Sequence, residues 1–172
     1  IIWPEKNLSL DLIFVIEKTY FQRRPLGAYG YFKTPRIGYD KSLQQGIAFN
    51  YFTNGACLSE VEVDLLTGDC KILRSDLLMD IGNSMNPEID KGQITGAFIQ
   101  GQGWVTTEVL KLALEGDKKG DLLSHSPTTY KIPNIQDIPR QFNIQFYPNP
   151  NNHYNLFGSK AVGEPPFLLG IS

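Results

Sequence analysis

The chain has few of the residues that build metal sites, disulfide frameworks and membrane spans. Its 172 residues include only two cysteines and two histidines, too few for the disulfide framework of a secreted domain. No stretch approaches the roughly 18 apolar residues that a membrane helix needs, so we expect no membrane partner. A net charge of −2 gives no electrostatic reason to bind nucleic acid. These absences indicate a cytoplasmic globular protein.

Both ends of the sequence predict a piece of something longer. The chain starts without methionine and stops inside the apolar segment FLLGIS, whereas a natural C-terminus is more often polar. We therefore expect residues 1–172 to form a single fragment of a larger domain, truncated at both ends.

Periodicity and turn residues predict an α+β fold with a mixed or antiparallel sheet and packed helices. Residues 8–21 favour a helix followed by a strand, and residues 23–35 an extended or looped segment. Further strands are expected at residues 47–53, 56–66, 69–79 and 143–147. The turn Thr67-Gly68-Asp69 predicts a hairpin, because glycine adopts positive φ most easily.

The hairpin register decides what the two cysteines can do. With Leu65 near Cys70, Cys57 lies toward the other end of the hairpin, so the two sulfurs are too far apart to bond. Both cysteines are expected to be small core residues.

A helix is expected to begin at Asn86-Pro87, since asparagine caps helices and proline suits the first helical position. Gly92 and Gly96 lie four residues apart and share a face of this helix. Each costs about 1 kcal/mol relative to alanine. We therefore expect this face to admit close approach by a ligand or by another backbone. Residues 104–114 fit either helix or strand.

Most motifs that carry chemistry are missing or incomplete. GQGWVTT lacks the lysine of a phosphate-binding loop, and the glycines of GAFIQGQG do not fit a dinucleotide fingerprint. His125 and His153 stand alone in polar loops and are expected to be solvated. The sequence therefore predicts no metal site built from protein ligands.

Glu164 stands out in the segment GSKAVGEPPFLLGIS, residues 158–172. Pro165 pushes the residue before it toward extended backbone angles, and Gly163 permits a bend. The apolar residues Phe167 and Leu168 follow, so the carboxyl group should be partly desolvated. Desolvation raises the pKa of a carboxyl group, which suits a general base near neutral pH. A loop acid that caps a helix starting at Pro165 is the alternative, and the residues alone leave it open.

Several long motifs in the same order resemble one family. GSKAVGEPPFLLGIS, NPEIDKGQITGAFIQGQGWVTTE, SPTTYKIP and YFTNGACLSEVEVDLLTGDCKILRSDLLMDIGNSMNP closely resemble the C-terminal part of the molybdenum-binding domain of the xanthine dehydrogenase family. The bacterial type, in which this domain is a separate subunit, looks nearest. The similarity runs from about residue 27 to the end. The two prolines after Glu164 look like the xanthine-type branch rather than the related aldehyde oxidases.

The resemblance implies roles for two residues. Glu164 matches the family's catalytic base, which takes a proton from a hydroxyl group on molybdenum before the oxygen attacks an electron-poor purine carbon. Gln93 matches the glutamine that hydrogen-bonds the molybdenum cofactor. Gln100 and Lys160 lie near these motifs, and neither receives a role.

The resemblance also implies cofactors and partners. The cofactor is molybdenum–molybdopterin, while FAD and 2Fe–2S clusters on other domains or subunits pass electrons to NAD. The partners are the remainder of the molybdenum subunit, an iron–sulfur/FAD subunit and a purine substrate, in an enzyme expected to be oligomeric. The segment alone is expected to be inactive, because the upstream half of the active site is missing from it. The alternatives are a related hydroxylase for aldehydes or other N-heterocycles, or a catalytically silent fragment that serves only as a folded or assembly module.

Overall fold

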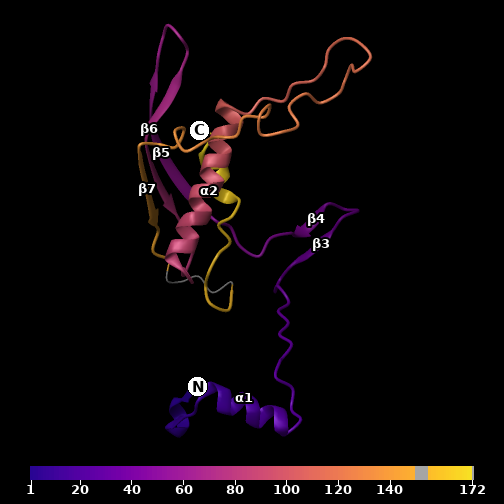
Figure 1. Cartoon of the computed structure of the whole chain (residues 1–172), viewed down its shortest axis with the longest axis vertical. Helices are drawn as coiled ribbons and strands as arrows, with labels where there is room; N and C mark the ends of the chain where they lie inside the picture. Colours follow the sequence, from indigo (N-terminus) through magenta and orange to yellow (C-terminus); the bar gives the residue numbers. More distant parts are fainter. Residues whose placement is uncertain (150–154, 172) are drawn as a thin grey trace. The chain divides into compact units, whose positions relative to one another are not determined.

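The computed structural model describes residues 1–149 and 155–171. The chain divides into two compact units, Ile1–Ile47 and Ala48–Ser172, and each is described by itself (Figure 1). No helix in the two described ranges is both long enough and apolar enough to cross a membrane.

The first unit consists of short elements joined by irregular chain. Its elements are β1 (Ile2–Trp3), the 3-10 turn η1 (Pro4–Lys6), β2 (Leu8–Ser9), α1 (Leu12–Phe21), β3 (Gly38–Asp40) and β4 (Gln45–Ile47). β1 pairs with β2 and β3 with β4, both antiparallel. The helix predicted within residues 8–21 is confirmed, and the carboxylate of Asp11 caps it by accepting the N–H groups of Ile13 and Phe14. The strand expected after the helix does not form, and residues 23–35 are irregular as predicted.

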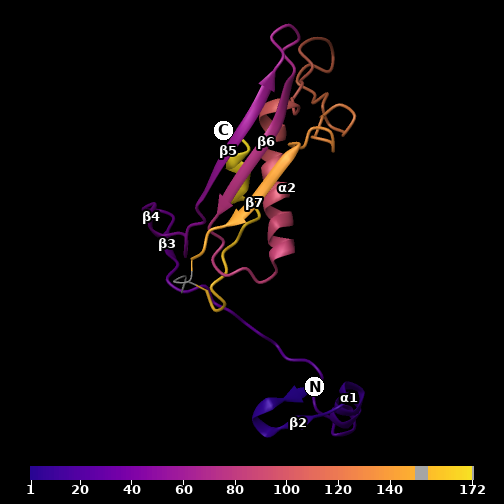
Figure 2. The same cartoon turned by 90° about the vertical axis from the view of Figure 1, so that its left-hand side faces the viewer.

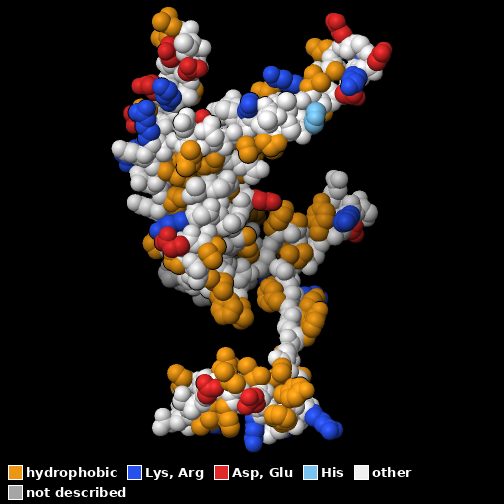
Figure 3. Space-filling view, in the orientation of Figure 1, with side chains coloured by type: hydrophobic (Ala, Val, Ile, Leu, Met, Phe, Trp, Pro, Cys, Tyr) orange, Lys and Arg blue, Asp and Glu red, His pale blue; other side chains and the backbone are white. Residues whose placement is uncertain are grey.

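This first unit has no core of its own. Among residues 1–47, all of which the structure describes, no side chain is buried. Apolar side chains of α1, including Ile13 at 66% and Phe21 at 79% exposure, face solvent, and Figure 3 shows many hydrophobic side chains on the surface of this unit. Burying a side chain of this size contributes about 1.5–3 kcal/mol, so this surface is available to pack against other polypeptide.

The second unit is built on a three-stranded sheet in the order β5-β6-β7 (Figure 2). Its strands are β5 (Gly55–Val63), β6 (Cys70–Met79) and β7 (Gln141–Phe146). β5 and β6 form the antiparallel hairpin that the sequence predicts, and β7 runs parallel to β6. The expected strand at 143–147 is therefore confirmed as β7, and the mixed sheet with its helices confirms the α+β class.

Two expectations around the hairpin are wrong. No strand spans residues 47–53, because β4 ends at Ile47 and irregular chain leads to β5. The turn is also longer than expected: the Asp64 carboxylate accepts two backbone N–H groups inside it, while Gly68 has the predicted positive φ of 79°. Cys70 consequently pairs with Val63 instead of lying near Leu65.

The two cysteines have different environments. Both are free, as the register argument predicts, but only Cys57 is half-buried, whereas Cys70 is exposed at the start of β6. The expectation of two core cysteines is therefore wrong for Cys70. Burial raises the pKa of the Cys57 thiol, which keeps it protonated.

Helix α2 (Pro87–Thr106) covers one face of the sheet. As predicted, the Asn86 side chain caps it, accepting the N–H of Ile89 at 3.3 Å, and proline opens the first turn. Of residues 104–114, for which helix and strand were both open, the first three continue the helix to Thr106 and the rest are irregular.

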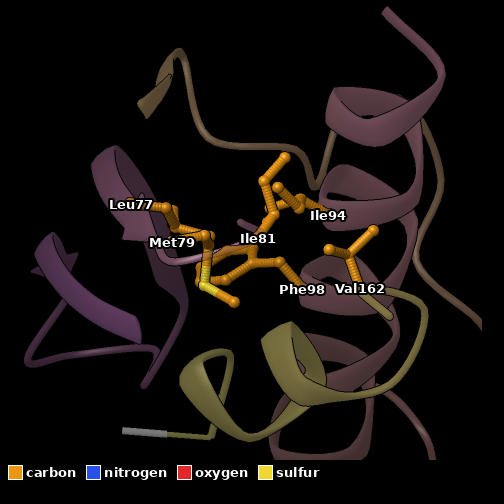
Figure 4. Packing of buried hydrophobic residues seen from close by; sticks show 6 residues of the cluster. All are labelled: Leu77, Met79, Ile81, Ile94, Phe98 and Val162. Atoms are coloured by element: carbon orange, nitrogen blue, oxygen red, sulfur yellow. The ribbon is translucent and has the colours of Figure 1, made fainter. Parts of the chain in front are cut away.

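The core lies between β6 and α2 (Figure 4). Alternate residues of β6 point toward the helix, so Leu77 and Met79 are 2% and 1% exposed. Ile94 and Phe98 of α2 meet them one helical turn apart. Ile81 and Val162 complete the cluster, and Val162 belongs to the segment that leads to Glu164.

The long connection between α2 and β7 is attached near the end of the helix. The Tyr130 hydroxyl donates to Glu108 at 2.5 Å, and this hydrogen bond, with burial and the charge of Glu108, raises the pKa of Tyr130. The Gln102 amide donates to the carbonyl of Asp137 at 2.7 Å.

Candidate active site

The approach to Glu164 is held by backbone hydrogen bonds along the end of β6. Ser159 forms an antiparallel bridge with Gly82, and the N–H of Lys160 donates to the carbonyl of Ile81 at 2.8 Å. Val162 then enters the core. Residues 159–162 are therefore attached to the chain that continues β6.

The same segment is also held by side chains of the irregular chain just before β5. The hydroxyl of Thr53 donates to the carbonyl of Ala161 at 2.9 Å, and the N–H of Ala161 donates to the hydroxyl of Tyr51 at 3.0 Å. Both backbone groups of Ala161 are thus satisfied by side chains of one short stretch. Three residues before Glu164, the chain has little freedom to shift.

Glu164 occupies the N-cap position of the short helix α3 (Pro165–Leu169). Its backbone angles, φ −110° and ψ −38°, are helical, so the extended conformation expected before proline is wrong. The carbonyl of Glu164 accepts the N–H of Phe167 at 2.9 Å, which holds this turn. The carboxylate makes no capping hydrogen bond. The capping alternative therefore gives the position of Glu164 correctly but does not account for its side chain.

The expected desolvation of Glu164 is not supplied by its own neighbours. The Glu164 side chain is exposed, and Leu168 is 68% exposed. Pro166 is buried instead, and Phe167 packs edge-on against Trp104 with 4.6 Å between ring centroids. The apolar residues that follow Glu164 therefore serve to dock α3, and water reaches the carboxylate in this chain.

Two glycines allow α3 to dock directly on the backbone of α2. A Cβ at Gly101 would lie 2.0 Å from the carbonyl oxygen of Phe167, and one at Gly170 would lie 2.3 Å from the carbonyl oxygen of Phe98. Real Cβ atoms do not approach so closely. Glycine is thus required at both positions if the two helices are to pack as they do.

The expectation of close approach at Gly92 and Gly96 is not met within this chain. No atom of the described part of the chain lies within 4 Å of a Cβ built at either residue, since their face of α2 points away from the sheet. The close backbone approach occurs at Gly101, on the opposite face. The open face leaves room for a group from outside this chain.

Gln93 lies beside the turn that carries Glu164. A Cβ built at Gly163 would be 3.5 Å from Oε1 of Gln93, an ordinary van der Waals distance. Any side chain at position 163 would therefore touch the Gln93 amide. Gln93 and Gly163, 70 positions apart in sequence, are brought together because α2 and α3 pack against each other.

The Gln93 amide and the Glu164 carboxylate offer unused hydrogen-bonding groups. Both side chains are exposed, and neither has a hydrogen-bond partner among the described residues. An amide both donates and accepts, and an ionised carboxylate accepts a proton. Together with the open glycine face, this donor set fits a flat, polar, ring-shaped cofactor edge next to a base. Their individual roles stay predictions.

Ionisable groups elsewhere do not form a competing centre. Within the part of the chain that the structure describes, no three His, Cys, Asp or Glu side chains group together to hold a metal ion. His125 is exposed, as predicted, and its Nδ1 lies 3.1 Å from the carbonyl oxygen of Leu122. His153 lies outside the described residues.

Comparison with known proteins identifies one family and several relatives that agree with it. The profile of the molybdopterin cofactor-binding domain family matches residues 3–139. A xanthine dehydrogenase of Dictyostelium discoideum is 42% identical over 171 residues, which cover 98% of this chain and 12% of that protein. Xanthine dehydrogenase 1 of Arabidopsis thaliana is 45% identical over 161 residues, which cover 92% of this chain and 12% of that protein. This chain therefore spans only 12% of the length of each of these curated relatives.

A solved structure shares the fold. The crystal structure of the aldehyde oxidoreductase from Desulfovibrio desulfuricans matches with a TM-score of 0.70 and 28% sequence identity. The match covers 88% of this chain and 16% of that chain.

Proposed function

Because this chain belongs to the molybdopterin cofactor-binding domain family, we propose that it supplies the catalytic base and one cofactor contact of a xanthine dehydrogenase-type molybdenum hydroxylase. The resemblance noted from the sequence motifs is confirmed by this membership. The observation that carries the proposal is the placement of Gly163 against the amide of Gln93. It supports the proposal because Gly163 directly precedes Glu164, so the turn that carries the proposed base lies next to the proposed cofactor contact.

Glu164 is the general base in this proposal. Among residues 1–149 and 155–171, nothing hydrogen-bonds its carboxylate, while its backbone is held from both sides. A base that is fixed in place and hydrogen-bonded to nothing else can take a proton from a reacting group within hydrogen-bond reach. When bound, the molybdenum–pterin group supplies the two-electron oxidation that no residue of this chain could carry out.

Gln93 orients that cofactor in this proposal. Its amide N–H groups donate and its carbonyl oxygen accepts, which matches a pterin edge that carries both kinds of atom. Gly92 and Gly96 leave the adjoining face of α2 open to it.

Residues outside this chain would complete the enzyme. The exposed apolar side chains of α1 and the exposure of Glu164 support a requirement for the rest of the molybdenum subunit, which would cover both. FAD and iron–sulfur partners, an oligomeric enzyme and a cytoplasmic location belong to the same proposal. Purine is favoured as substrate, because the relatives of higher identity are xanthine dehydrogenases, while the aldehyde oxidoreductase is 28% identical.

The test uses Glu164→Gln in the complete enzyme. This isosteric change removes the proton acceptor but keeps the size of the side chain, so turnover of xanthine and hypoxanthine should be abolished. Molybdenum and pterin content should stay close to wild type. Glu62→Gln, at an exposed position of β5, is the matched control and should leave turnover unchanged. Substantial residual turnover by Glu164→Gln would remove the general-base assignment.

Gln93→Ala tests the cofactor contact separately. Loss of the amide should lower the molybdenum content of the purified enzyme, measured by elemental analysis. Gln145→Ala, at an exposed position of β7, is the control and should load normally. A Gln93→Ala enzyme with full metal content and full turnover would contradict the assignment.

A further inference from the structure

The segment that leads into the Glu164 turn carries an ion pair whose two partners are nearly buried. Nζ of Lys160 lies 2.6 Å from Oδ2 of Asp80, and the side chains are 5% and 12% exposed. Asp80 directly follows the last residue of β6. Lys160 stands four residues before Glu164. The pair therefore joins the approach to the turn to the end of the central strand.

Asp80 is held in its charged form at this position. Nδ2 of Asn149 donates to the same Oδ2 at 2.9 Å, and the N–H of Gly82 donates to Oδ1 at 3.1 Å. Burial opposes ionisation, but the hydrogen bonds from Lys160, Asn149 and Gly82 outweigh it and hold the pKa of Asp80 below its ordinary value. The ammonium group of Lys160 thus faces a fixed negative charge.

Stability alone does not explain an ion pair at a nearly buried position. Well-packed apolar residues often stabilise a fold equally well or better, because both charges must be desolvated. A short, charge-assisted hydrogen bond nevertheless restricts position more narrowly than apolar contact does. Lys160 reaches Asp80, and Val162 enters the core two residues later, so these side chains together define the register of the segment.

We propose that Lys160 is a positioning residue for Glu164: its ion pair with Asp80 fixes the register of residues 159–163 and thereby the place of the turn that carries Glu164, where Gly163 lies against Gln93. Lys160 does not touch the reacting atoms and acts only through the chain. This inference rests on the proposed function, in which Glu164 is the base.

The experiment compares Lys160→Met and Lys160→Arg in the complete enzyme. Methionine keeps the length of the side chain but loses the charge, so kcat should fall roughly 10- to 100-fold, the scale of effect of a misplacement of about 1 Å. KM and molybdenum content should stay within about twofold of wild type, since the ion pair involves neither Gln93 nor Glu164. Arginine keeps the charge and should recover most of kcat. Arg74→Met removes a more exposed ion pair, with Asp76 on the same strand, and should leave kcat unchanged.

A double variant distinguishes positioning from plain stability. Lys160→Met leaves Asp80 as an uncompensated charge and should lower the melting temperature, whereas Lys160→Met with Asp80→Asn removes both charges and should restore it. The positioning role predicts that kcat stays low in the double variant, because the tether is still missing. If kcat recovers together with the melting temperature, Lys160 serves stability alone and the proposal is overturned.

Glu164→Gln, measured in the same series, separates this proposal from the one on which it rests. Full activity of Glu164→Gln would overturn both. An inactive Glu164→Gln beside a fully active, molybdenum-loaded Lys160→Met would overturn the positioning role alone.

Discussion

Replacing Gly101 by alanine should damage the docking of α3, whereas the same replacement at Gly96 should not. At Gly101 the new Cβ would lie 2.0 Å from the carbonyl oxygen of Phe167, and ordinary contact begins at 3.4 Å. The two backbones must therefore separate by about 1.4 Å. Overpacking of this kind typically costs about 1–3 kcal/mol. The gain in helix propensity, about 1 kcal/mol, offsets part of that cost.

Gly96 lies on the same helix but meets no atom within 4 Å among the described residues. Alanine has a higher helix propensity than glycine and would meet no clash there. The replacement should therefore raise the free energy of unfolding by up to about 1 kcal/mol. The pair of variants therefore shares one chemical change and differs only in what the added methyl group meets.

The assay is urea unfolding of the 172-residue chain, followed by circular dichroism. The urea midpoint should fall for Gly101→Ala and stay equal or rise for Gly96→Ala, with similar slopes for both. In the complete enzyme, displacement of α3 should also lower kcat of Gly101→Ala by roughly 100-fold, because Glu164 moves with the helix. A Gly101→Ala chain at least as stable as Gly96→Ala would refute the direct backbone contact.

Two further predictions concern the core and the buried ion pair. Phe98→Ala should lower the free energy of unfolding by about 3–5 kcal/mol, measured by the urea midpoint, since Phe98 is 1% exposed and packs on both β6 and β7. Because the folded-state pKa of Asp80 is lowered, its contribution to stability should be complete above about pH 4, near the unfolded pKa, and should disappear as pH falls through the folded pKa. The difference in midpoint between wild type and Asp80→Asn should accordingly shrink on acidification, and a difference that is constant from pH 7 to pH 2 would contradict this.

Local sequence signals predicted the elements that local interactions determine. Asn86 and Pro87 cap and open α2, and Gly68 supplies the positive φ of the hairpin turn. In each case the structural cause lies within a few residues of the signal. α1 was expected from the composition of residues 8–21, whereas its cap, Asp11, was not identified from the sequence.

Features that depend on distant parts of the chain were missed or placed wrongly. The sequence of β7 predicts a strand, but nothing in it indicates parallel pairing with β6, in which each paired residue lies 67 positions away from its partner. The glycines of α2 predicted a close approach, yet which glycine is approached depends on where α3, about 65 residues later in the sequence, docks on the helix. Cysteine is a residue type that is usually buried, but the hairpin turn is longer than expected and Cys70 lies exposed at the start of β6.

The candidate site shows the same division. Glu164 and Gln93 were identified from motifs, while the importance of Lys160 depends on Asp80, which is 80 residues earlier in the chain. One signal was available: Lys160 stands two residues before Val162, which enters the core, and a lysine on the inward side of an extended segment is usually paired.

Glu164 is held firmly in position by this chain, yet its side chain is exposed. This chain provides the position of the carboxylate, through the bonds of residues 159–162, the glycine contacts of α3 and the ion pair of Lys160. The described residues provide no apolar wall around it, because Phe167 and Pro166 are used for docking. In the proposed function, the rest of the molybdenum subunit would exclude water from the carboxylate and would also cover the apolar surface of α1. In that enzyme, changes at Lys160 or Gly101 should move the Glu164 carboxylate without altering the residues around it, whereas changes in the rest of the subunit should alter those surroundings without moving it.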